Sequence, residues 1–233
     1  MNTTSHSPNA ISTKDTQSIL IVSATDRPAS TSLAVSRQLE NVMRGLGSSV
    51  EVLDLAALPP GFFSPAAYAS CKDTHRQEVR PWLAASGLLF VVPEYHGSYP
   101  GALKHYLDLL PFPAALAGKV AAFVGLAPGQ LGGINAVTHL AALCSSRHCR
   151  ILREHVLIPG ADTQNAEATF SPATDDRLIN HCAALLASLT LLNTKKLTVL
   201  KKVAEKTTPL PRETRLFLSH EENHSRNCAN YGT

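Results

Sequence analysis

The feature that most constrains the fold is an uninterrupted apolar run, Leu88 to Val92, that leads directly into a polar loop. Large apolar and β-branched residues in succession predict a strand covered on both faces, which is typical of a parallel sheet. The run stops at Pro93, which has no N–H to donate to a neighbouring strand. From Leu103 to Leu110 the apolar residues recur at helical spacing, and Pro111 ends this helix.

The loop between this strand and this helix is rich in turn-forming residues. Ser98 is a candidate N-cap of the helix, and Pro100 suits its first turn. The loop follows the carboxyl end of a parallel strand, which is where open α/β sheets bind ligands. We therefore expect a ligand site here.

Similar patterns on either side predict an alternating order of strands and helices. The predicted strands are 19–23, 50–55, 88–92, 119–126 and 149–152, with 156–158 as a short extension of the last. Helices are expected after the first loop, over 73–85, from about 134 to 146, and after Pro172. In the first helix, Val35, Leu39, Val42, Met43 and Leu46 form the expected inner stripe. Five strands alternating with helices predict a doubly wound parallel sheet of order 2-1-3-4-5, with its ligand site between strands one and three.

The loop after the first predicted strand has the composition of an anion site. Thr25, Ser30 and Ser32 supply hydroxyls before a helix N-terminus, and Arg27 adds a positive charge. Helix N-termini attract anions, and guanidinium groups bind phosphate through paired hydrogen bonds. An ordinary capped turn is the alternative, but Arg27 and the position directly after the first strand favour a phosphate site.

At these residues the chain resembles the NADPH-dependent FMN reductases, which have a flavodoxin-like fold. Pro93-Glu94-Tyr95-His96-Gly97-Ser98-Tyr99-Pro100-Gly101, followed by Leu103-Lys104, resembles the signature loop of that family, with His96 where Asn is usual. The loop at Thr25 to Ser32 resembles the family's phosphate loop, with Ala24 and Ala29 where glycine is frequent. Gly129, in the segment Ala127 to Gly133, matches a glycine-rich third loop more loosely.

The resemblance implies FMN as cofactor and NADPH or NADH as hydride donor. The implied FMN-binding residues are Thr25, Arg27, Ser30, Ser32, Pro93, Glu94, Tyr95, His96, Gly97, Ser98 and Gly129. Backbone amides from Glu94 to Ser98 would face the flavin ring, and no side chain need act as an acid or base. Glu94 either positions the backbone or contacts the flavin, and Tyr95 and Tyr99 either pack near the ring or support the loop.

The remaining composition sets the domain organisation. We expect a disordered arm over 1–17, a flavodoxin-like domain over 18–194 and a basic, partly disordered extension over 195–233. The formal net charge is +3, but from Lys195 onward eight Lys/Arg and four Asp/Glu give +4, which leaves the body near neutral. No apolar run is long enough to span a membrane, and a near-neutral body disfavours nucleic acid as partner.

The cysteines and the N-terminus favour a cytoplasmic protein without metal. Five cysteines, no CxxC and no apolar leader predict reduced thiols. Cys144, Cys149, His139 and His148 fit no standard zinc spacing.

Three functional hypotheses follow. The first is an enzyme that passes electrons to a flavin, quinone, azo or metal-oxyanion acceptor; the resemblance implies that it is a homodimer or homotetramer. The second is a flavodoxin-type electron carrier, although such carriers are usually acidic and dock on basic partners. The third is a flavin-binding module without turnover.

Overall fold

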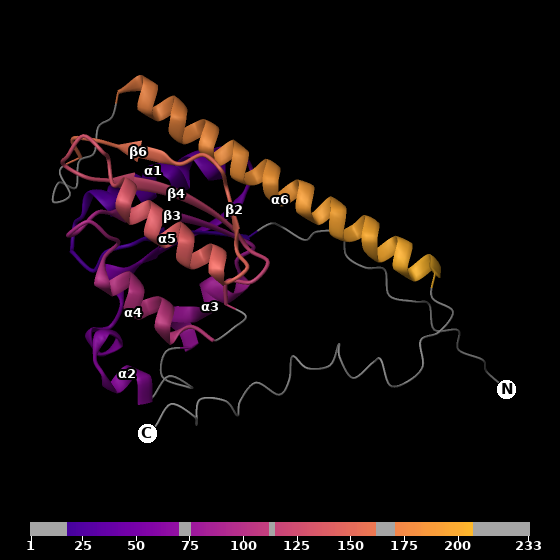
Figure 1. Cartoon of the computed structure of the whole chain (residues 1–233), viewed down its shortest axis with the longest axis horizontal. Coiled ribbons are helices and arrows are strands. Elements are labelled where there is room, and N and C mark those ends of the chain that lie inside the picture. The colour runs from indigo at the N-terminus through magenta and orange to yellow at the C-terminus, as the bar shows by residue number, and fades with distance from the viewer. Residues whose placement is uncertain (1–17, 70–75, 112–114, 162–170, 207–233) are drawn as a thin grey trace.

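A computed structural model describes residues 18–69, 76–111, 115–161 and 171–206, and within them six strands form one parallel sheet (Figure 1). The strands are β1 (Ser18–Ser23), β2 (Ser49–Asp54), β3 (Gly87–Pro93), β4 (Val120–Leu126), β5 (Arg150–Ile151) and β6 (Val156–Ile158). They lie in the order β2-β1-β3-β4-β5, and β6 also pairs with β4. The predicted order 2-1-3-4-5 is confirmed.

The fifth predicted strand is divided into two pieces. Ala121 pairs with Ile151 in β5, and Val124 pairs with Val156 in β6, so both pieces pair along the same edge of β4. The chain leaves that edge after Ile151 and returns at Val156, as the expected short extension. The count of five strands therefore becomes six.

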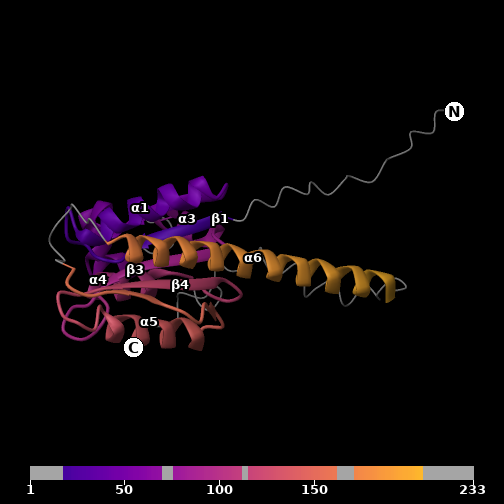
Figure 2. The ribbon, with the colours of Figure 1, turned by 90° about the horizontal axis from the view of Figure 1, so that it is seen from above.

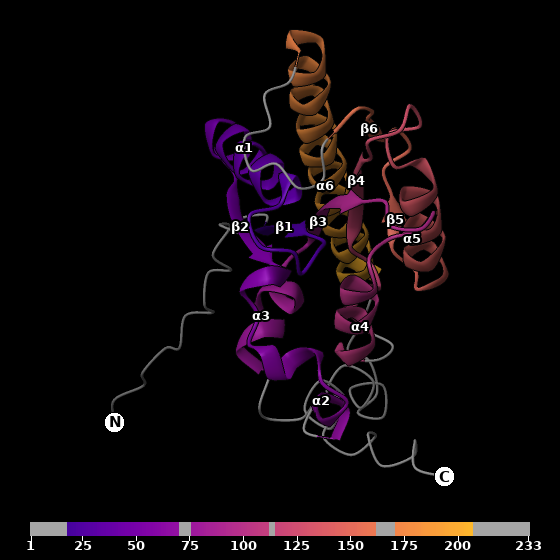
Figure 3. The same cartoon turned by 90° about the vertical axis from the view of Figure 1, so that its left-hand side faces the viewer.

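The two faces of the sheet are covered by separate helical layers (Figure 3). Every residue of β3 and of β4 is buried, as the continuous apolar runs predicted. On one face Ile19 and Ile21 pack with α1 (Thr31–Gly45) and α6 (Pro172–Lys206). On the other, Leu20 and Val22 pack with α3 (Arg76–Ala84), α4 (Gly101–Leu109) and α5 (Ile134–Ser146). This arrangement is the doubly wound α/β fold that the sequence predicted.

The connection from β2 to α3 is built from short helices. It contains η1 (Leu55–Ala57), η2 (Pro60–Phe63) and α2 (Ala66–Ala69). Phe62 is fully buried and its ring stacks on Tyr106 of α4, with centroids 5.5 Å apart. The start of the helix expected over 73–85 lies partly outside the described residues, which resume with α3 at Arg76.

Helix α1 confirms most of its predicted inner stripe. Val35, Leu39 and Met43 are fully buried and Val42 is half-buried. Leu46 is 44% exposed, so its assignment to the stripe is wrong. The helix ends at Gly45 and Leu46 is the C-cap, which places its side chain outside the helical periodicity.

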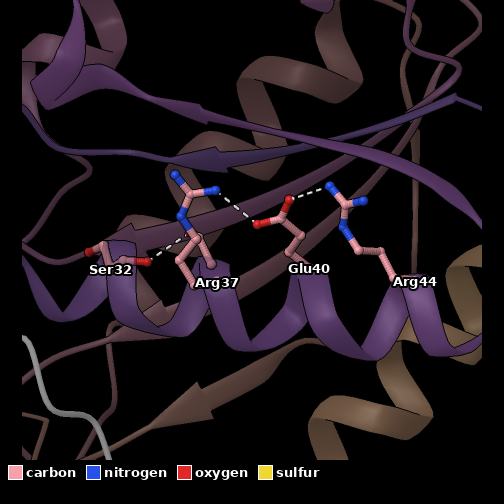
Figure 4. A network of polar contacts seen from close by, with 5 residues as sticks. Ser32, Arg37, Glu40 and Arg44 are labelled. Atoms are coloured by element: carbon pink, nitrogen blue, oxygen red, sulfur yellow. Dashed lines mark hydrogen bonds and ion pairs between the residues drawn. The ribbon is translucent and has the colours of Figure 1, made fainter.

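One side of α1 carries a small ion-pair network (Figure 4). Glu40 accepts hydrogen bonds from Arg44 at 2.7 Å and from Arg37 at 2.8 Å. These two contacts lower the pKa of the Glu40 carboxyl. Arg37 and Arg44 remain exposed, so each pair contributes only about 0.3–0.5 kcal/mol to stability.

Helix α4 begins later than expected. Its N-cap is Pro100, without a side-chain capping bond, and the helix starts at Gly101. The expectation that Ser98 caps this helix is wrong. The Ser98 backbone closes a tight turn with Tyr95, and its hydroxyl lies 3.0 Å from Nδ1 of His139 on α5.

Helix α6 runs along the sheet and then extends past it (Figure 2). Leu178, Cys182, Leu185 and Leu189 are buried against the sheet, and burial raises the pKa of the Cys182 thiol to about 12, as expected for a core thiol. Leu189 lies so close to Gly87 that a Cβ there would be 2.8 Å from Leu189 Cδ1. The helix continues without a break to Lys206, through the expected boundary at 194. No helix of the described ranges combines the length and apolarity needed to cross a membrane.

Buried His181 on α6 predicts a loss of stability in acid. It is 4% exposed, its Nε2 has no hydrogen-bond partner among the described residues, and burial together with the nearby His155 and Arg177 lowers its pKa to about 4. Because the folded state binds the proton more weakly than the unfolded chain, stability is full above the ordinary histidine pKa and falls as the pH drops from about 6.5 to about 4. One pKa unit corresponds to about 1.4 kcal/mol, so the contribution is on the order of 3 kcal/mol.

We predict that His181→Gln, which can still donate a hydrogen bond but does not titrate, flattens most of this pH dependence in urea unfolding. Some dependence should remain, because burial also lowers the pKa of His155. His148→Gln removes an exposed imidazole and serves as the control. An unchanged slope in the His181 variant would contradict the assignment.

Candidate functional site

Three loops meet at the carboxyl edge of the sheet. They follow β1 (residues 24–30), β3 (94–100) and β4 (127–133), and these three strands are neighbours. Backbone hydrogen bonds join the starts of the loops: the Ala24 amide donates to Val91 O at 3.0 Å, and the Glu94 amide donates to Leu126 O at 2.9 Å. The two loops predicted to bind a ligand therefore lie side by side, with the third loop next to the second.

The first loop leads into an N-terminus suited to an anion. Ser30 is the N-cap of α1, and its hydroxyl accepts the Leu33 amide at 3.2 Å. Thr25, Ser30 and Ser32 are buried, whereas Arg27 is exposed. The first turn of this 15-residue helix contains no acidic residue. A negatively charged group would thus meet the positive end of the helix dipole without a competing carboxylate.

Tyr95 connects the second loop to the first. Its hydroxyl lies 3.0 Å from Oγ1 of Thr25, which also accepts the Arg27 amide at 3.3 Å. The Arg27 guanidinium carbon lies 4.3 Å from the centroid of the Tyr95 ring, within the range of a cation–π contact. The Tyr95 side chain of the second loop therefore contacts both Thr25 and Arg27 of the first loop.

The second loop contains a tight turn with a left-handed backbone. The Tyr95 amide donates to Ser98 O at 2.9 Å, and the Ser98 amide donates to Tyr95 O at 3.1 Å. Between them His96 has φ 51° and Gly97 has φ 73°. Positive φ at both central positions defines a type I′ turn, which favours Asn followed by Gly. This backbone requirement explains why Asn suits position 96, and His is also among the residues that tolerate the conformation.

The turn also narrows the set of amides available to a ligand. Five amides from Glu94 to Ser98 were expected to face a flavin. Those of Glu94, Tyr95 and Ser98 are bonded within the protein, which corrects that expectation. Of these five amides, those of His96 and Gly97 lack a hydrogen-bond partner among the described residues. Any ligand bonded to this turn would therefore meet its two central amides.

The Glu94 carboxylate caps α5. It accepts the Asn135 amide at 2.9 Å, the Ala136 amide at 3.3 Å and the Asn135 side-chain Nδ2 at 3.1 Å. Helix α5 has Gly133 as its own N-cap and so has no capping side chain of its own. These contacts agree with the hypothesis that Glu94 positions backbone. Together with the Ser98–His139 contact, they attach the second loop to α5.

The third loop is shaped by two glycines that approach the protein's own backbone. A Cβ at Gly133 would lie 2.7 Å from Leu126 N, and one at Gly132 would lie 2.9 Å from Ile158 N. Both glycines have positive φ, so no other residue would fit well. Gly129, by contrast, is exposed with nothing within 4 Å of an added Cβ. Leu131 and Ile134 beside it are 66% and 40% exposed.

Several other residues singled out in the sequence are buried or packed against the core. Pro93 is buried at the end of β3, and Tyr99 packs against the core, where burial raises its pKa. Cys144 and Cys149 are free and buried, and burial raises the pKa of the Cys149 thiol to about 11. In the ranges that the structure describes, no group of three or more His, Cys, Asp or Glu side chains could hold a metal ion.

The sheet order and the position of these loops define the chain as a flavodoxin-like α/β protein. The model of the NADPH-dependent FMN reductase family matches residues 18–163, and the chain belongs to that family. The resemblance seen in the signature loop is thus confirmed over most of the domain.

Known relatives agree with this assignment, and a solved structure agrees with the fold. An NADPH azoreductase of Bacillus sp. (strain OY1-2) is 33% identical over 84 residues, which are 36% of this chain and 47% of that protein. A 2-hydroxy-1,4-benzoquinone reductase of Burkholderia sp. is 26% identical over 147 residues, covering 60% of this chain and 79% of that one. The flavoenzyme NAD(P)H:(acceptor) oxidoreductase FerB of Paracoccus denitrificans has the same fold, with a TM-score of 0.61, 18% identity and coverage of 75% of this chain and 97% of that one. The chain therefore spans about half of the azoreductase but most of the other two proteins.

Sequence reasoning missed Asn135 and His139. Each contacts the second loop from 41 positions away, so local patterns do not reveal the partner. One signal was present: α5 follows Gly132-Gly133, and a helix without a capping residue requires a cap from elsewhere.

Removing the Glu94 carboxylate should release the start of α5. We predict that Glu94→Ala lowers the free energy of unfolding by about 1–2 kcal/mol, because two helix amides lose a charged acceptor. Glu94→Gln, which keeps an acceptor oxygen, should cost less. Urea unfolding measures both, with Glu51→Ala on exposed β2 as the control. Equal effects at Glu51 and Glu94 would refute the capping role.

Proposed function

We propose that this chain is an FMN-containing oxidoreductase that takes a hydride from NADPH or NADH and passes electrons to a small-molecule acceptor. The observation that carries the proposal is the contact between the Arg27 loop and the His96–Gly97 turn through Tyr95, at the point where the strand order reverses. Doubly wound sheets bind their ligands at this point. Membership of the NADPH-dependent FMN reductase family supports the same cofactors.

The residues of the first loop fit the phosphate of FMN. The N-terminus of α1 provides amides and a positive dipole, without an acid in the first turn. Thr25, Ser30 and Ser32 add hydroxyls, and Arg27 adds a guanidinium that forms hydrogen bonds with phosphate oxygens. In this proposal these four residues bind the phosphate.

The second and third loops fit the flavin ring. The amides of His96 and Gly97 would donate to its polar edge, while Glu94 and Ser98 hold the turn against α5. Gly129 leaves open space, and exposed Leu131 and Ile134 offer apolar surface beside it. When bound, FMN would supply the hydride-transfer and electron-transfer chemistry. The protein would bind and orient the flavin and the substrates, and no side chain is assigned as acid or base.

The acceptor belongs to a class of small aromatic or inorganic oxidants. Relatives named as an NADPH azoreductase and a 2-hydroxy-1,4-benzoquinone reductase support azo compounds and quinones as first candidates. Flavins and metal oxyanions are also included in the proposal. We further propose a cytoplasmic homodimer or homotetramer.

An electron carrier is the second candidate function. A flavodoxin from Pseudomonas aeruginosa shares the fold, with a TM-score of 0.50 and 19% identity. Carriers of this type exchange electrons with other proteins and need a separate reductase. Oxidation of the nicotinamide by the purified chain distinguishes the two functions.

We predict that the purified chain, loaded with FMN, oxidises NADPH or NADH in the presence of a quinone without any other protein. Absorbance at the reduced nicotinamide band measures the rate, and the same mixture with free FMN but no protein is the control. No rate above that control, with FMN stoichiometrically bound, would favour the carrier or the module without turnover. A screen of azo, flavin and chromate acceptors then identifies the preferred class.

Arg27 should distinguish FMN from riboflavin, which lacks the phosphate. Hydrogen bonds to charged groups are worth about 1.5–3 kcal/mol, so Arg27→Ala should weaken FMN roughly ten- to a hundred-fold. Riboflavin should bind almost as before. Titrating the flavin-free chain with both ligands measures the effect.

Arg37→Ala is the matched control, because it removes one arginine from the exposed face of α1, where Arg37 pairs with Glu40 (Figure 4). It should leave both affinities unchanged. Equal weakening of FMN and riboflavin by Arg27→Ala would indicate a disturbed loop instead of a lost phosphate contact.

A further inference from the structure

Arg27 has a defined position even though its loop is exposed. Residues 26–29 are all exposed. Among the described residues, the Arg27 guanidinium carbon lies 4.3 Å from the centroid of the Tyr95 ring, so this side chain contacts the loop after β3. A long arginine side chain on such a loop would otherwise sample many rotamers. The tyrosine ring therefore restricts the group that the proposed function assigns to phosphate.

The contact with the Tyr95 ring is compatible with binding of an anion by Arg27. A guanidinium that lies flat against an aromatic ring keeps its N–H groups at the outer edge. Those edge donors are the ones that bind a phosphate in paired fashion. Stacking on Tyr95 and binding of phosphate are thus compatible, and the first can prepare the second.

The Tyr95 hydroxyl restrains the same loop at a second point. It lies 3.0 Å from Thr25 Oγ1, which accepts the Arg27 amide at 3.3 Å. The Arg27 backbone and side chain are therefore each connected to Tyr95, one through Thr25 and the other directly. Tyr95 in turn is held by the two backbone hydrogen bonds of its turn with Ser98.

We propose that Tyr95 is a positioning residue that orders Arg27 and Thr25 for phosphate and so makes the site selective for phosphorylated flavin over riboflavin. This inference rests on the proposed function, in which Arg27 binds the FMN phosphate. A group ordered during folding loses less freedom on binding, which increases affinity for the ligand that uses it. Riboflavin has no phosphate to contact Arg27, so the ordering of Arg27 does not increase its affinity.

The test measures FMN and riboflavin affinities of the flavin-free full-length chain by titration. Tyr95→Met keeps an apolar side chain of similar length but removes the ring face and the hydroxyl; it should weaken FMN about five- to fifty-fold and riboflavin less than about two-fold. Tyr95→Phe keeps the ring and removes only the bond to Thr25; it should weaken FMN about three- to five-fold. Circular dichroism and urea midpoints confirm that each variant is folded.

A double-mutant cycle separates positioning from direct contact. In the Arg27→Ala background, Tyr95→Met should weaken FMN by a clearly smaller factor than it does in the parent chain, because the ring no longer orders a guanidinium. If Tyr95→Met fails to fold, the selective loss in Tyr95→Phe carries the test.

Several outcomes would overturn the inference. Equal weakening of FMN and riboflavin would mean that Tyr95 contacts the ring or merely supports the loop. Full additivity with Arg27→Ala would mean that the two residues act independently. If the parent chain binds FMN tightly and the Tyr95 variants bind it equally well, the positioning role of Tyr95 is refuted and the proposed function is not. A parent chain that binds no FMN would refute the proposed function as well.

Discussion

The pairing of β1 on both of its edges determines where the rest of the molecule lies. β1 pairs in parallel with β2 on one side and with β3 on the other, so the chain must cross back over β1 to continue the sheet. As a result, the helices that follow β1 and β3 cover opposite faces of the sheet. Helix α1 packs in one core layer and α4 packs in the other. The loops after β1 and β3 start side by side and then diverge. That reversal places the N-terminus of α1, the proposed phosphate site, beside the left-handed turn at His96 and Gly97.

The loop after β3 then fixes the other two loops. Glu94 caps α5, Tyr95 holds Thr25 and Arg27, and Ser98 contacts His139. Each contact joins segments that are far apart in sequence, so the loops are ordered when the chain folds and not only when a ligand binds. Order established in folding reduces the entropy that binding must overcome. The loop that resembles the family signature therefore makes structural contacts to the loop after β1 and to α5.

The fold was predictable from the sequence because its signals are local and periodic. The run from Leu88 to Val92 indicated a strand buried on both faces, and the alternation with helices led to the observed strand order. The errors occurred where local residue type and tertiary context disagree. Ser98 has the chemistry of a helix cap, but its backbone is used in the turn with Tyr95. The partners of Glu94 lie 41 and 42 positions away, beyond the reach of any pattern along the chain.

A crystal structure of the full-length chain with bound FMN tests the central claim most directly. The account predicts the phosphate at the N-terminus of α1, within hydrogen-bond distance of Arg27 and of the hydroxyls at Ser30 or Ser32. It also predicts the polar edge of the ring at the amides of His96 and Gly97, with Arg27 still against Tyr95. FMN bound elsewhere on the sheet, or bound here with its phosphate away from Arg27 and α1, would contradict the account.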